Sequence, residues 1–548
     1  MSHWTKTPQV RIHPTYYGNS LHSDWSFNTS KNYNESNIYK WSKPIRVSNV
    51  TWQGAGENGT KFVASADLTE LMDQLIEQEN YNLLASNMIS LHRSLPDSRS
   101  DECKRLSYPE KLPNTSIVII FHNEAWTPLL RTAWSVVERS PPELINEIIL
   151  VDDASTMSDL KRPLDDYIEQ IPGRIKLIRL SKREGLIRAR LVGAKHASGS
   201  VLTFLDGHIE CNEGWLQPLL ARIANDRSVI AVPYMDAISS HDMSYRSGKN
   251  AKIHGFRWSL IFDWMPVPER ERIRTKYDYT ASIRTPTMVG CAFSIDREFF
   301  FEIGSYDEGM DIWGSENMEM SLRVWQCGGS MEMIPCSHVG HLFRISTYSF
   351  DGDPLLIKGR NNVRLVEVWM EDDAKRMFYA TNNYCQNVSA GDITQRIELK
   401  KQLKCKDFRW YLENVYPESM LRKKFVDFVQ IRNVKVNKCL DIYPGTEHTS
   451  LKLYSCHGHR KNQLLFLTND QMIVTRRQFC VGVDEKQHTV QQMLCNYDDS
   501  NWWRYENGTK WIVHVPSGQC MQAAHARVVL GKCDTSDETV KWNIESTP

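Results

Sequence analysis

Two residues that commonly bind divalent metals stand two positions apart near the middle of the chain. Asp206 and His208 follow the mostly apolar run 201–205, which has the length of a buried strand. In an extended segment, residues two apart project to the same side, so a carboxylate oxygen and an imidazole nitrogen can face one point. This mixed pair of donors suits an ion of the manganese or zinc kind. The same residues also fit a strand end with a solvated aspartate and a surface histidine.

The chain around this pair alternates short apolar runs with helical patterns, which predicts a doubly wound, mostly parallel α/β sheet. Ligands bind at the carboxyl edge of such sheets. Polar residues follow several predicted strands at this edge: His122-Asn-Glu124, Asp152-Asp153 and Asp206. We therefore expect one functional site at one edge of the sheet. The predicted strands are 116–121, 147–153, 176–180 and 201–205, and the predicted helices are 127–138, one from about 158, and 184–196.

Length and composition indicate a folded protein of two or three domains. The chain has 548 residues, of which 41% are apolar and 17 are tryptophans, enough for more than one core. Its Lys+Arg and Asp+Glu counts are equal at 66 each, so no net positive charge favours a nucleic-acid partner. No apolar run approaches the roughly 18 residues of a membrane span, and the first residues lack a signal-peptide core. We therefore expect a chain that is soluble or lacks its targeting segment.

Sequons and cysteines favour an oxidising compartment. Thirteen cysteines, several in regular pairs, fit the lumen of the secretory pathway better than the cytosol. Seven Asn-x-Ser/Thr triplets agree with this interpretation, and four of them lie in the first 60 residues. They begin at Asn28, Asn34, Asn49, Asn58, Asn114, Asn387 and Asn507.

Composition predicts a stem before the first domain, and the remaining elements of that domain are predicted from residue patterns and from the placement of Gly290 and Ser315. Residues 1–75 are polar without apolar periodicity, which predicts a flexible stem. Further along, a strand is expected to run into Gly290, because glycine permits close backbone approach there. Ser315 fits the N-cap of an amphipathic helix. The other expected elements are a helical pattern at 76–97, a strand at 331–335 before His338 and His341, and helices near 362–379 and 390–404.

The C-terminal part contains three repeats of one small unit. Cysteines at 439, 480 and 520 are 41 and 40 residues apart, and each is followed by a second one, at 456, 495 and 533. A period near 40 with a cysteine pair in each unit is typical of a repeated, short-stranded module. The three units are expected to close into a β-trefoil over 425–548. The alternative is an unrelated disulfide-rich β domain.

Several long segments of the chain occur in the same order in a known enzyme family. They are Asn82-Leu-Leu-Ala-Ser86, Arg93-Ser-Leu-Pro-Asp97, Phe121-His-Asn-Glu-Ala125, Ile148-Ile-Leu-Val-Asp-Asp153, Arg183-Glu-Gly-Leu186, Trp313-Gly-Ser-Glu-Asn317, Arg323-Val-Trp-Gln-Cys-Gly-Gly329 and Glu367-Val-Trp-Met370. From about residue 78 onward the chain resembles the polypeptide N-acetylgalactosaminyltransferases, which begin mucin-type O-glycosylation. The resemblance implies a GT-A catalytic domain over 76–420 and a ricin-type lectin domain over 425–548. It also implies UDP-GalNAc as donor, Mn2+ as cofactor, Ser or Thr of polypeptides as acceptor, and the Golgi lumen, although the membrane anchor usual in the family is absent.

The resemblance also implies roles for single residues. Asp206, His208 and the distant His341 would bind the metal, and Arg344 would add a fixed positive charge at the leaving diphosphate. The remaining donor residues would be His122, Asp153 and Arg183 at the uridine, Arg190, Asp206, Gly290, Glu316 and Asn317 around the sugar, Trp313 beside the leaving group, and Tyr348 in a loop over the donor.

Three of these residues have simpler interpretations. Glu316 can complement a helix N-terminus, Trp313 can pack in the core, and His341 can be a core histidine. The family retains the anomeric configuration, and we favour orientation of the substrates over a covalent role for Glu316.

In the C-terminal repeats the resemblance implies a sugar site and a set of disulfides. The first repeat keeps the GalNAc-binding set Asp441, Tyr454, His457 and Asn462, although Asp441 can also stabilise its own turn. The third repeat has Gln522 at the aspartate position and is expected not to bind. The implied disulfides are Cys103–Cys336, Cys327–Cys405, Cys439–Cys456, Cys480–Cys495 and Cys520–Cys533, which leave Cys211, Cys291 and Cys385 free.

Three departures from the family pattern bear on activity. Cys291 and Ser315 replace glycines, so a Cβ at either position could narrow the sugar pocket. Ile120 replaces a threonine, with the loss of one hydroxyl contact of roughly 0.5–1.5 kcal/mol. None is an implied metal ligand, so the sequence favours an active, Mn2+-dependent transferase with lectin-assisted glycopeptide recognition. The alternatives are a catalytically impaired relative that acts as a GalNAc-binding lectin, and a transferase with altered UDP-sugar or acceptor preference.

Overall fold

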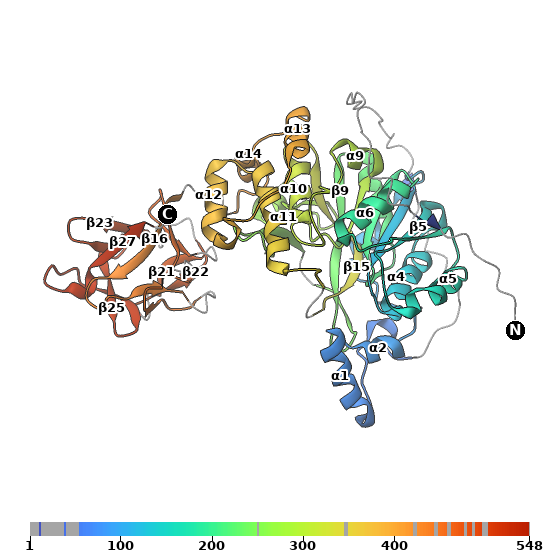
Figure 1. The fold of residues 1–548 in the computed structure, drawn as a ribbon, viewed down its shortest axis with the longest axis horizontal. Coiled ribbons are helices and arrows are strands. Elements are labelled where there is room, and N and C mark those ends of the chain that lie inside the picture. Colours follow the sequence, from blue (N-terminus) through green and yellow to red (C-terminus); the bar gives the residue numbers. More distant parts are fainter. Residues whose placement is uncertain are drawn as a thin grey trace. The chain divides into compact units, whose positions relative to one another are not determined.

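The computed structural model describes residues 10–11, 38–39, 54–248, 251–344, 349–419, 425–442, 448–457, 462–475, 479–484, 488–495 and 502–546. The chain forms two compact units (Figure 1). The first comprises Met1–Gly255, Trp264–Trp369 and Val388–Tyr411, and the second Phe256–Asp263, Met370–Asn387 and Leu412–Pro548. Within the described part of the chain, no helix has both the length and the apolar character of a bilayer span.

The first unit is built on a mixed sheet of 11 strands, counted over the described residues. Its strands β6, β5, β4 and β7 are parallel neighbours, as the sequence predicts. Beyond β7, strand β14 lies antiparallel between β7 and β9, and β15 runs parallel to β9. The bounds are β4 Thr115–Phe121, β5 Ile145–Asp152, β6 Ile175–Arg179, β7 Val201–Asp206, β9 Val229–Ile238, β13 Ile283–Arg284, β14 Ala292–Asp296 and β15 Ser330–Leu342.

Helices cover both faces of the parallel strands. Every residue of β4 and β7 is buried, as in strands enclosed on two sides. On one face, Ile117 and Ile119 pack in one core cluster with α4 (Trp126–Glu138) and α7 (Leu216–Asn225). On the other face, α6 (Gly185–His196) approaches so closely that a Cβ at Gly193 would lie 2.3 Å from Val118 Cγ1. The predicted doubly wound α/β fold is therefore confirmed.

Strand β15 is much longer than the sequence predicts. A strand is expected at 331–335, whereas β15 extends over Ser330–Leu342 and includes His341. Its second half pairs with β9 on one side and with β8 (Ile209–Cys211) on the other. Because β8 begins directly after His208, this pairing brings His341 next to His208.

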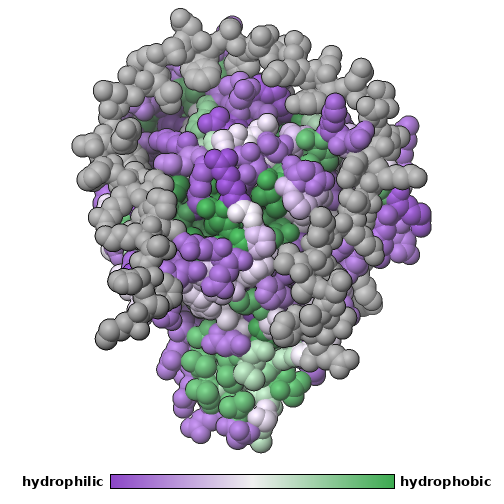
Figure 2. Space-filling model, turned by 90° about the vertical axis from the view of Figure 1, so that its right-hand side faces the viewer, coloured by the Kyte–Doolittle hydropathy of each residue, from purple (hydrophilic) through white to green (hydrophobic). Residues whose placement is uncertain are grey.

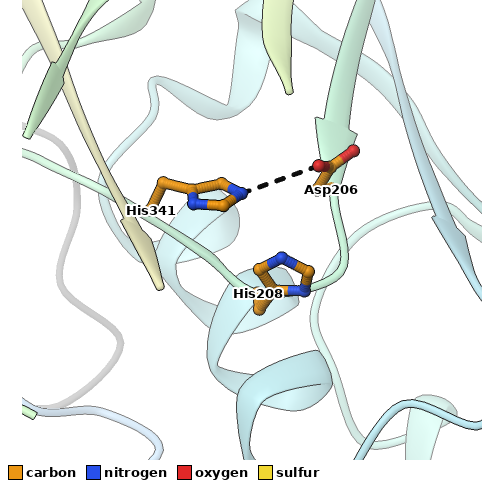
Figure 3. A group of neighbouring side chains, drawn as sticks. All are labelled: Asp206, His208 and His341. Atoms are coloured by element: carbon orange, nitrogen blue, oxygen red, sulfur yellow. Dashed lines mark ion pairs between the residues drawn. The ribbon is translucent and has the colours of Figure 1, made fainter. Parts of the chain in front are cut away.

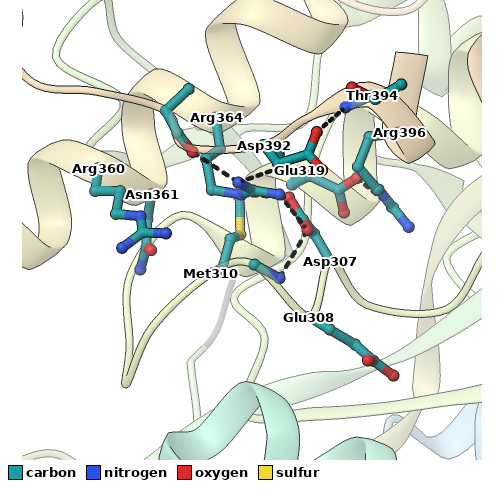
Figure 4. A network of polar contacts seen from close by, with 12 residues as sticks. Asp307, Glu308, Met310, Glu319, Arg360, Asn361, Arg364, Asp392, Thr394 and Arg396 are labelled. Atoms are coloured by element: carbon teal, nitrogen blue, oxygen red, sulfur yellow. Dashed lines mark hydrogen bonds and ion pairs between the residues drawn. The ribbon is translucent and has the colours of Figure 1, made fainter. Parts of the chain in front are cut away.

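Buried ion pairs tie the helices of the first unit together (Figure 4). Glu319 of α10 (Glu316–Gln326) accepts hydrogen bonds from Arg323 at 2.9 and 3.0 Å and from Arg396 of α13 (Thr394–Gln402) at 2.7 Å. Arg364 of α11 (Pro354–Trp369) donates to both carboxylate oxygens of Asp307 at 2.9 Å. These contacts hold α10 and α11 around the segment that connects Asp307 to the start of α10.

Two short helices replace the single helical pattern expected at 76–97. They are α1 (Thr69–Glu79) and α2 (Leu83–Met88). Asn80 has a left-handed φ of 62° and ends α1, and the Asn82 side chain caps α2 by accepting from the Ala85 amide at 2.8 Å. Figure 1 places α1 at the lower end of the view, and Figure 2 shows that apolar residues lie on the surface at this end. Inside the predicted stem, the Phe62 amide donates to Asp242 O at 2.8 Å, so this part of the stem packs on the rest of the first unit.

The second unit contains three repeats around one core. Leu440, Val481 and Met521, which follow the first cysteine of each repeat, are fully buried in one cluster. Trp503 and Trp542 donate from Nε1 to the carbonyls of Val481 and Met521, both at 2.7 Å. The strands are β16 Phe425–Asn433, β17 Cys439–Asp441, β18 Lys452–Tyr454, β19 Leu465–Thr468, β20 Ile473–Thr475, β21 Cys480–Asp484, β22 Thr489–Met493, β23 Trp503–Glu506, β24 Trp511–His514, β25 Gln519–Ala524, β26 Arg527–Gly531 and β27 Trp542–Ser546.

All five expected disulfides are formed, two in the first unit and one in each repeat. Cys211, Cys291 and Cys385 are buried and form no disulfide, as expected from the pairing.

Candidate active site

Three side chains, at the end of β7, in the turn after it and on β15, meet at the carboxyl edge of the first unit's sheet (Figure 3). Asp206 ends β7, His208 follows it by two residues, and His341 lies near the end of β15. One ligand atom of each residue lies within 4.8 Å of the other two. Asp206 and His341 are both only 7% exposed. One carboxylate and two imidazoles are donors that manganese or zinc accepts.

The charge states of these residues suit a metal ion. Burial opposes ionisation of Asp206, but His341 and Arg190 hold the pKa of its carboxyl below the usual range. Burial lowers the pKa of His341, so its imidazole is neutral. His341 Nε2 lies 3.7 Å from Asp206 Oδ2, and its Nδ1 has no hydrogen-bond partner among the described residues. Metal binding requires an ionised carboxylate and a neutral imidazole, which Asp206 and His341 supply, so these residues fit a divalent cation.

A buried glutamate links His208 to Arg344. One oxygen of Glu124 lies 3.0 Å from His208 Nδ1, and the other accepts a hydrogen bond from the Arg344 guanidinium. The guanidinium also lies 4.7 Å from the ring centroid of Tyr81. Burial opposes ionisation of Glu124, but Arg344 and His208 lower its pKa to about 2. Sequence reasoning assigned Glu124 no role, and its position in the polar triplet after β4 is the signal that could have found it.

Arg190 connects the metal cluster to the implied sugar pocket. Its guanidinium donates to Asp206 Oδ1 at 2.9 Å, to Gly290 O at 2.7 Å and to the Tyr306 hydroxyl at 3.1 Å. Gly290 has a φ of +92°, and a Cβ there would lie 3.0 Å from Asn317 Cβ. Glycine is required both by this φ and by the close approach of α10. The structure thus brings together Arg190, Asp206, Gly290 and Asn317.

The loop that carries Trp313 is held from two sides. The carbonyl of Ile312 accepts from the Leu186 amide of α6 at 2.8 Å. Asn361 of α11 donates to the carbonyl of Gly314 at 3.0 Å. Trp313 itself is partly exposed, and the Lys358 ammonium lies 4.7 Å from its ring centroid. Trp313 is therefore not a core residue, and Asn361 is a positioning group that sequence reasoning missed.

Glu316 lies at the start of α10, the position that its simpler interpretation predicts. It begins α10, and its Oε2 accepts a hydrogen bond from the Gly314 amide at 2.8 Å, so it complements the start of the helix. The carboxyl is only 4% exposed, and burial raises its pKa despite the nearby charge of Arg190.

The residues implied at the uridine lie at the adjoining strand ends. His122 Nδ1 is 2.7 Å from the carbonyl of Asp153. The Asp153 carboxylate accepts from the amides of Glu184 and Gly185 at 2.6 and 2.8 Å and so caps α6. Arg183 donates to Ser349 Oγ at 2.7 Å. Tyr348 lies outside the described residues.

The two departures from glycine are accommodated differently. Cys291 is buried in the core cluster, with its sulfur 3.9 Å from Met235 Sδ. Ser315 has a left-handed φ of 65°, which explains a preference for glycine at this position. Its side chain does not cap α10, contrary to expectation, and instead donates to Asn362 Oδ1 of α11.

Replacing Ser315 with glycine is expected to change the free energy of unfolding by less than about 1 kcal/mol. Glycine removes a strain of about 1 kcal/mol at the left-handed φ, but it also removes a hydrogen bond to Asn362 of similar worth. Urea denaturation of both proteins measures the difference. A loss above about 2 kcal/mol would mean that the hydroxyl contact outweighs the strain.

The implied lectin residues gather in the first repeat of the second unit. Asp441 Oδ2 lies 3.9 Å from His457 Nε2 and accepts from Gln463 Nε2 at 3.2 Å. Tyr454 is 63% exposed, and the carbonyl of Asn462 accepts from the amide that follows Asp441 at 3.1 Å. These contacts place His457 and Gln463 at the Asp441 carboxylate, and Tyr454 lies opposite Cys439 in the β17–β18 pair.

In the third repeat, the side chain at the position of Asp441 makes hydrogen bonds within the repeat. Gln522 donates to Asp537 and Thr539, both at 3.0 Å, so its amide is held within the repeat.

The chain is similar to known proteins in sequence and in structure. Family models described as "Glycosyl transferase family 2", "N-terminal domain of galactosyltransferase" and "Ricin-type beta-trefoil lectin domain" match residues 116–300, 270–347 and 427–542. "Polypeptide N-acetylgalactosaminyltransferase 13" of Homo sapiens is 47% identical over 471 residues, which cover 86% of this chain and 84% of that protein. "Polypeptide N-acetylgalactosaminyltransferase 5" of Caenorhabditis elegans is 42% identical over 507 residues, 90% of this chain and 80% of that protein. The solved structure of GalNAc-T7 with UDP, GalNAc and Mn2+ has a TM-score of 0.73 and 33% identity, covering 96% of this chain and 99% of that chain.

Proposed function

The chain belongs to the polypeptide N-acetylgalactosaminyltransferase family, and on this basis we propose that it transfers GalNAc from UDP-GalNAc to Ser and Thr residues of polypeptides with retention of configuration. The observation that carries the proposal is the cluster of Asp206, His208 and His341, linked through Glu124 to Arg344. A metal and a fixed cation are the two groups that a departing diphosphate needs.

The proposed metal ligands are Asp206, His208 and His341. When bound there, Mn2+ supplies Lewis-acid stabilisation of the charge that develops on the leaving diphosphate. Arg344 adds a fixed positive charge, and its pairing with Glu124 orients it. The uridine end is assigned to His122, Asp153 and Arg183, and the family resemblance adds Tyr348 as a further donor residue.

We assign contacts with the sugar and with the leaving group to residues of α6, of α10 and of the chain that connects them. Arg190, Gly290 and Asn317 would hold the GalNAc ring, and Trp313 would lie beside the leaving group. Glu316 is poorly suited to act as a nucleophile, because one oxygen accepts from the Gly314 amide and burial raises the pKa of its carboxyl. These side chains would act by holding the acceptor hydroxyl close to the anomeric carbon and by excluding water.

The domain boundaries and the compartment belong to the same proposal. We assign 1–75 to a stem, 76–420 to the catalytic domain and 425–548 to the lectin domain. The family relationship and the five disulfides support the Golgi lumen as the place of action. In this arrangement the lectin domain would bind GalNAc already attached to a glycopeptide and so raise the effective concentration of neighbouring acceptor sites.

A transfer assay tests the proposed reaction directly. The full chain is incubated with UDP-GalNAc and a threonine-rich peptide, first with Mn2+ and then with a chelator. Glycopeptide is expected only with Mn2+. No transfer in either condition would overturn the proposal and favour a catalytically impaired, GalNAc-binding lectin. The same assay with a panel of UDP-sugars identifies a transferase that uses a donor other than UDP-GalNAc.

Replacing Asp441 with asparagine is expected to lower kcat/KM about tenfold or more for a peptide that already carries GalNAc, and to leave the naked peptide unaffected. The loss corresponds to one charge-assisted hydrogen bond of about 1.5–3 kcal/mol. Asp484→Asn in the second repeat is the matched control. Equal losses on both peptides would show that Asp441 acts through the fold and not through sugar binding.

A further inference from the structure

One buried carboxylate outside the implied metal and donor sets contacts both a proposed metal ligand and the proposed diphosphate cation. Glu124 is 6% exposed and follows β4. Its Oε2 lies 3.0 Å from His208 Nδ1. Its Oε1 accepts from the Arg344 guanidinium and from the Ala125 amide, the latter at 3.0 Å. We propose that Glu124 is a positioning residue, which sets the tautomer of His208 for the metal and the orientation of Arg344 for the diphosphate. The inference rests on the proposed function.

The contact with Glu124 decides which nitrogen of His208 can bind a metal. A carboxylate paired with a guanidinium is ionised and can only accept hydrogen bonds. His208 Nδ1 must therefore carry a proton, so Nε2 is the nitrogen whose lone pair can bind a metal. Neutral histidine binds metals through its unprotonated nitrogen, and a carboxylate on the other nitrogen fixes the tautomer and the ring orientation.

The other oxygen of the same carboxylate orients Arg344. The guanidinium of Arg344 contacts Glu124 and also lies over the Tyr81 ring at 4.7 Å from the centroid. A planar guanidinium with a carboxylate at its edge and a ring at its face has one orientation. Glu124 therefore couples the end of β4 to His208, which follows β7, and to Arg344, which follows β15. One side chain sets both groups that would face the leaving diphosphate.

The substitution Glu124→Gln makes the proposal testable with almost no change in shape. An amide has one accepting oxygen and one donating NH2 group. If the oxygen of the introduced amide accepts from Arg344, its NH2 group faces His208 Nδ1 and forces the proton to Nε2. If the amide is reversed, two donors face each other at Arg344. Either orientation damages one of the two contacts that glutamate satisfies together.

Mn2+ binding to the metal-free full chain, followed by electron paramagnetic resonance, is the principal test. Glu124→Gln is expected to weaken Mn2+ binding about 10–100-fold, the usual effect of losing such an outer partner. It is also expected to weaken UDP binding in the absence of metal, measured by calorimetry, because Arg344 is no longer held. The matched control is Asp236→Asn, which removes the carboxylate 3.0 Å from Nδ1 of another buried histidine, His338, that is not a proposed ligand. The control is expected to keep the Mn2+ affinity of the unmodified chain.

The outcomes separate this inference from the proposed function. Unchanged Mn2+ and UDP affinities in Glu124→Gln, with a wild-type chain that binds both, would overturn the role of Glu124 alone. A wild-type chain that binds no Mn2+ would instead overturn the proposed metal site. A second test uses nitrogen NMR of the wild-type chain and so does not depend on a folded Glu124 variant. The His208 signals are assigned as those that disappear in His208→Gln. The spectrum is expected to show the Nδ1–H tautomer, and an Nε2–H tautomer contradicts the proposal.

Discussion

Replacing His341 with alanine is expected to lower kcat/KM for GalNAc transfer about 10³-fold and to abolish its response to Mn2+. The substitution removes one of three proposed ligands, and the remaining Asp206 and His208 provide only a pair. A loss of about 4 kcal/mol of transition-state stabilisation corresponds to this factor, because each 1.36 kcal/mol is tenfold. The measurements are initial rates over a range of Mn2+ concentrations and direct Mn2+ binding.

His338 supplies the control, because it is a buried histidine on the same strand. It is 6% exposed, against 7% for His341, and its Nδ1 lies 3.0 Å from Asp236. His338→Asn is expected to reduce stability while transfer still responds to Mn2+. A His341→Ala enzyme that keeps more than a tenth of the wild-type kcat/KM, with a normal response to Mn2+, would remove His341 from the metal site.

Replacing Glu319 with glutamine is expected to lower the free energy of unfolding of the first unit by about 3–5 kcal/mol. The Arg323 side chain is fully buried and that of Arg396 is 11% exposed, so both would keep a charge without the carboxylate that neutralises them. Trp369 Nε1, which donates to Glu319 at 3.0 Å, would also be disturbed. Denaturation monitored by tryptophan fluorescence measures the loss.

Glu398 provides a matched glutamate-to-glutamine control on the surface. Its side chain is 53% exposed, and it pairs with Lys401 at 3.0 Å. Glu398→Gln is expected to change stability by no more than about 0.5 kcal/mol, because an exposed pair is screened by water. Similar losses in the two variants would mean that burial of the Glu319 cluster does not matter.

The same glutamate predicts how the difference between wild type and variant depends on pH. The pKa of Glu319 is lowered from 4.5 to about 2: burial opposes ionisation, and Arg323 and Arg396 outweigh it. A group whose folded pKa is depressed contributes stability above its unfolded pKa and loses it as the pH falls toward the folded value. The gap between wild type and Glu319→Gln is therefore expected to be constant above about pH 5 and to shrink below it. A gap that widens on acidification would contradict this assignment.

Much of the sheet could be predicted because its signals are local. The run at 201–205 is apolar because β7 is buried on both faces, and the structure extends it by one residue, to Asp206. The break between α1 and α2 was missed, since a helical period continues through Asn80 while the left-handed φ of that residue interrupts the helix. The antiparallel direction of β14 was also not predicted, because an apolar run does not encode the direction of its neighbours.

The interpretation of the sugar pocket changed most. On sequence alone, Cys291 and Ser315 stand together as possible obstructions where the family has glycine. The structure separates them: the Cys291 sulfur packs against Met235, whereas Ser315 takes a left-handed φ and contacts α11. A sequence position does not say into which space its Cβ projects.

By itself the sequence determined the strand that ends in Asp206, the two-residue spacing to His208, and the cysteine period of the C-terminal repeats, because each is set by residues close together in the chain. The family resemblance implied His341 as the third ligand, but only the tertiary structure brings it to the pair and joins Glu124 to Arg344. The physical reason is strand register. His341 reaches His208 because β15 pairs with β8 in one alignment, and a slip of one residue would turn its side chain to the opposite face of the sheet.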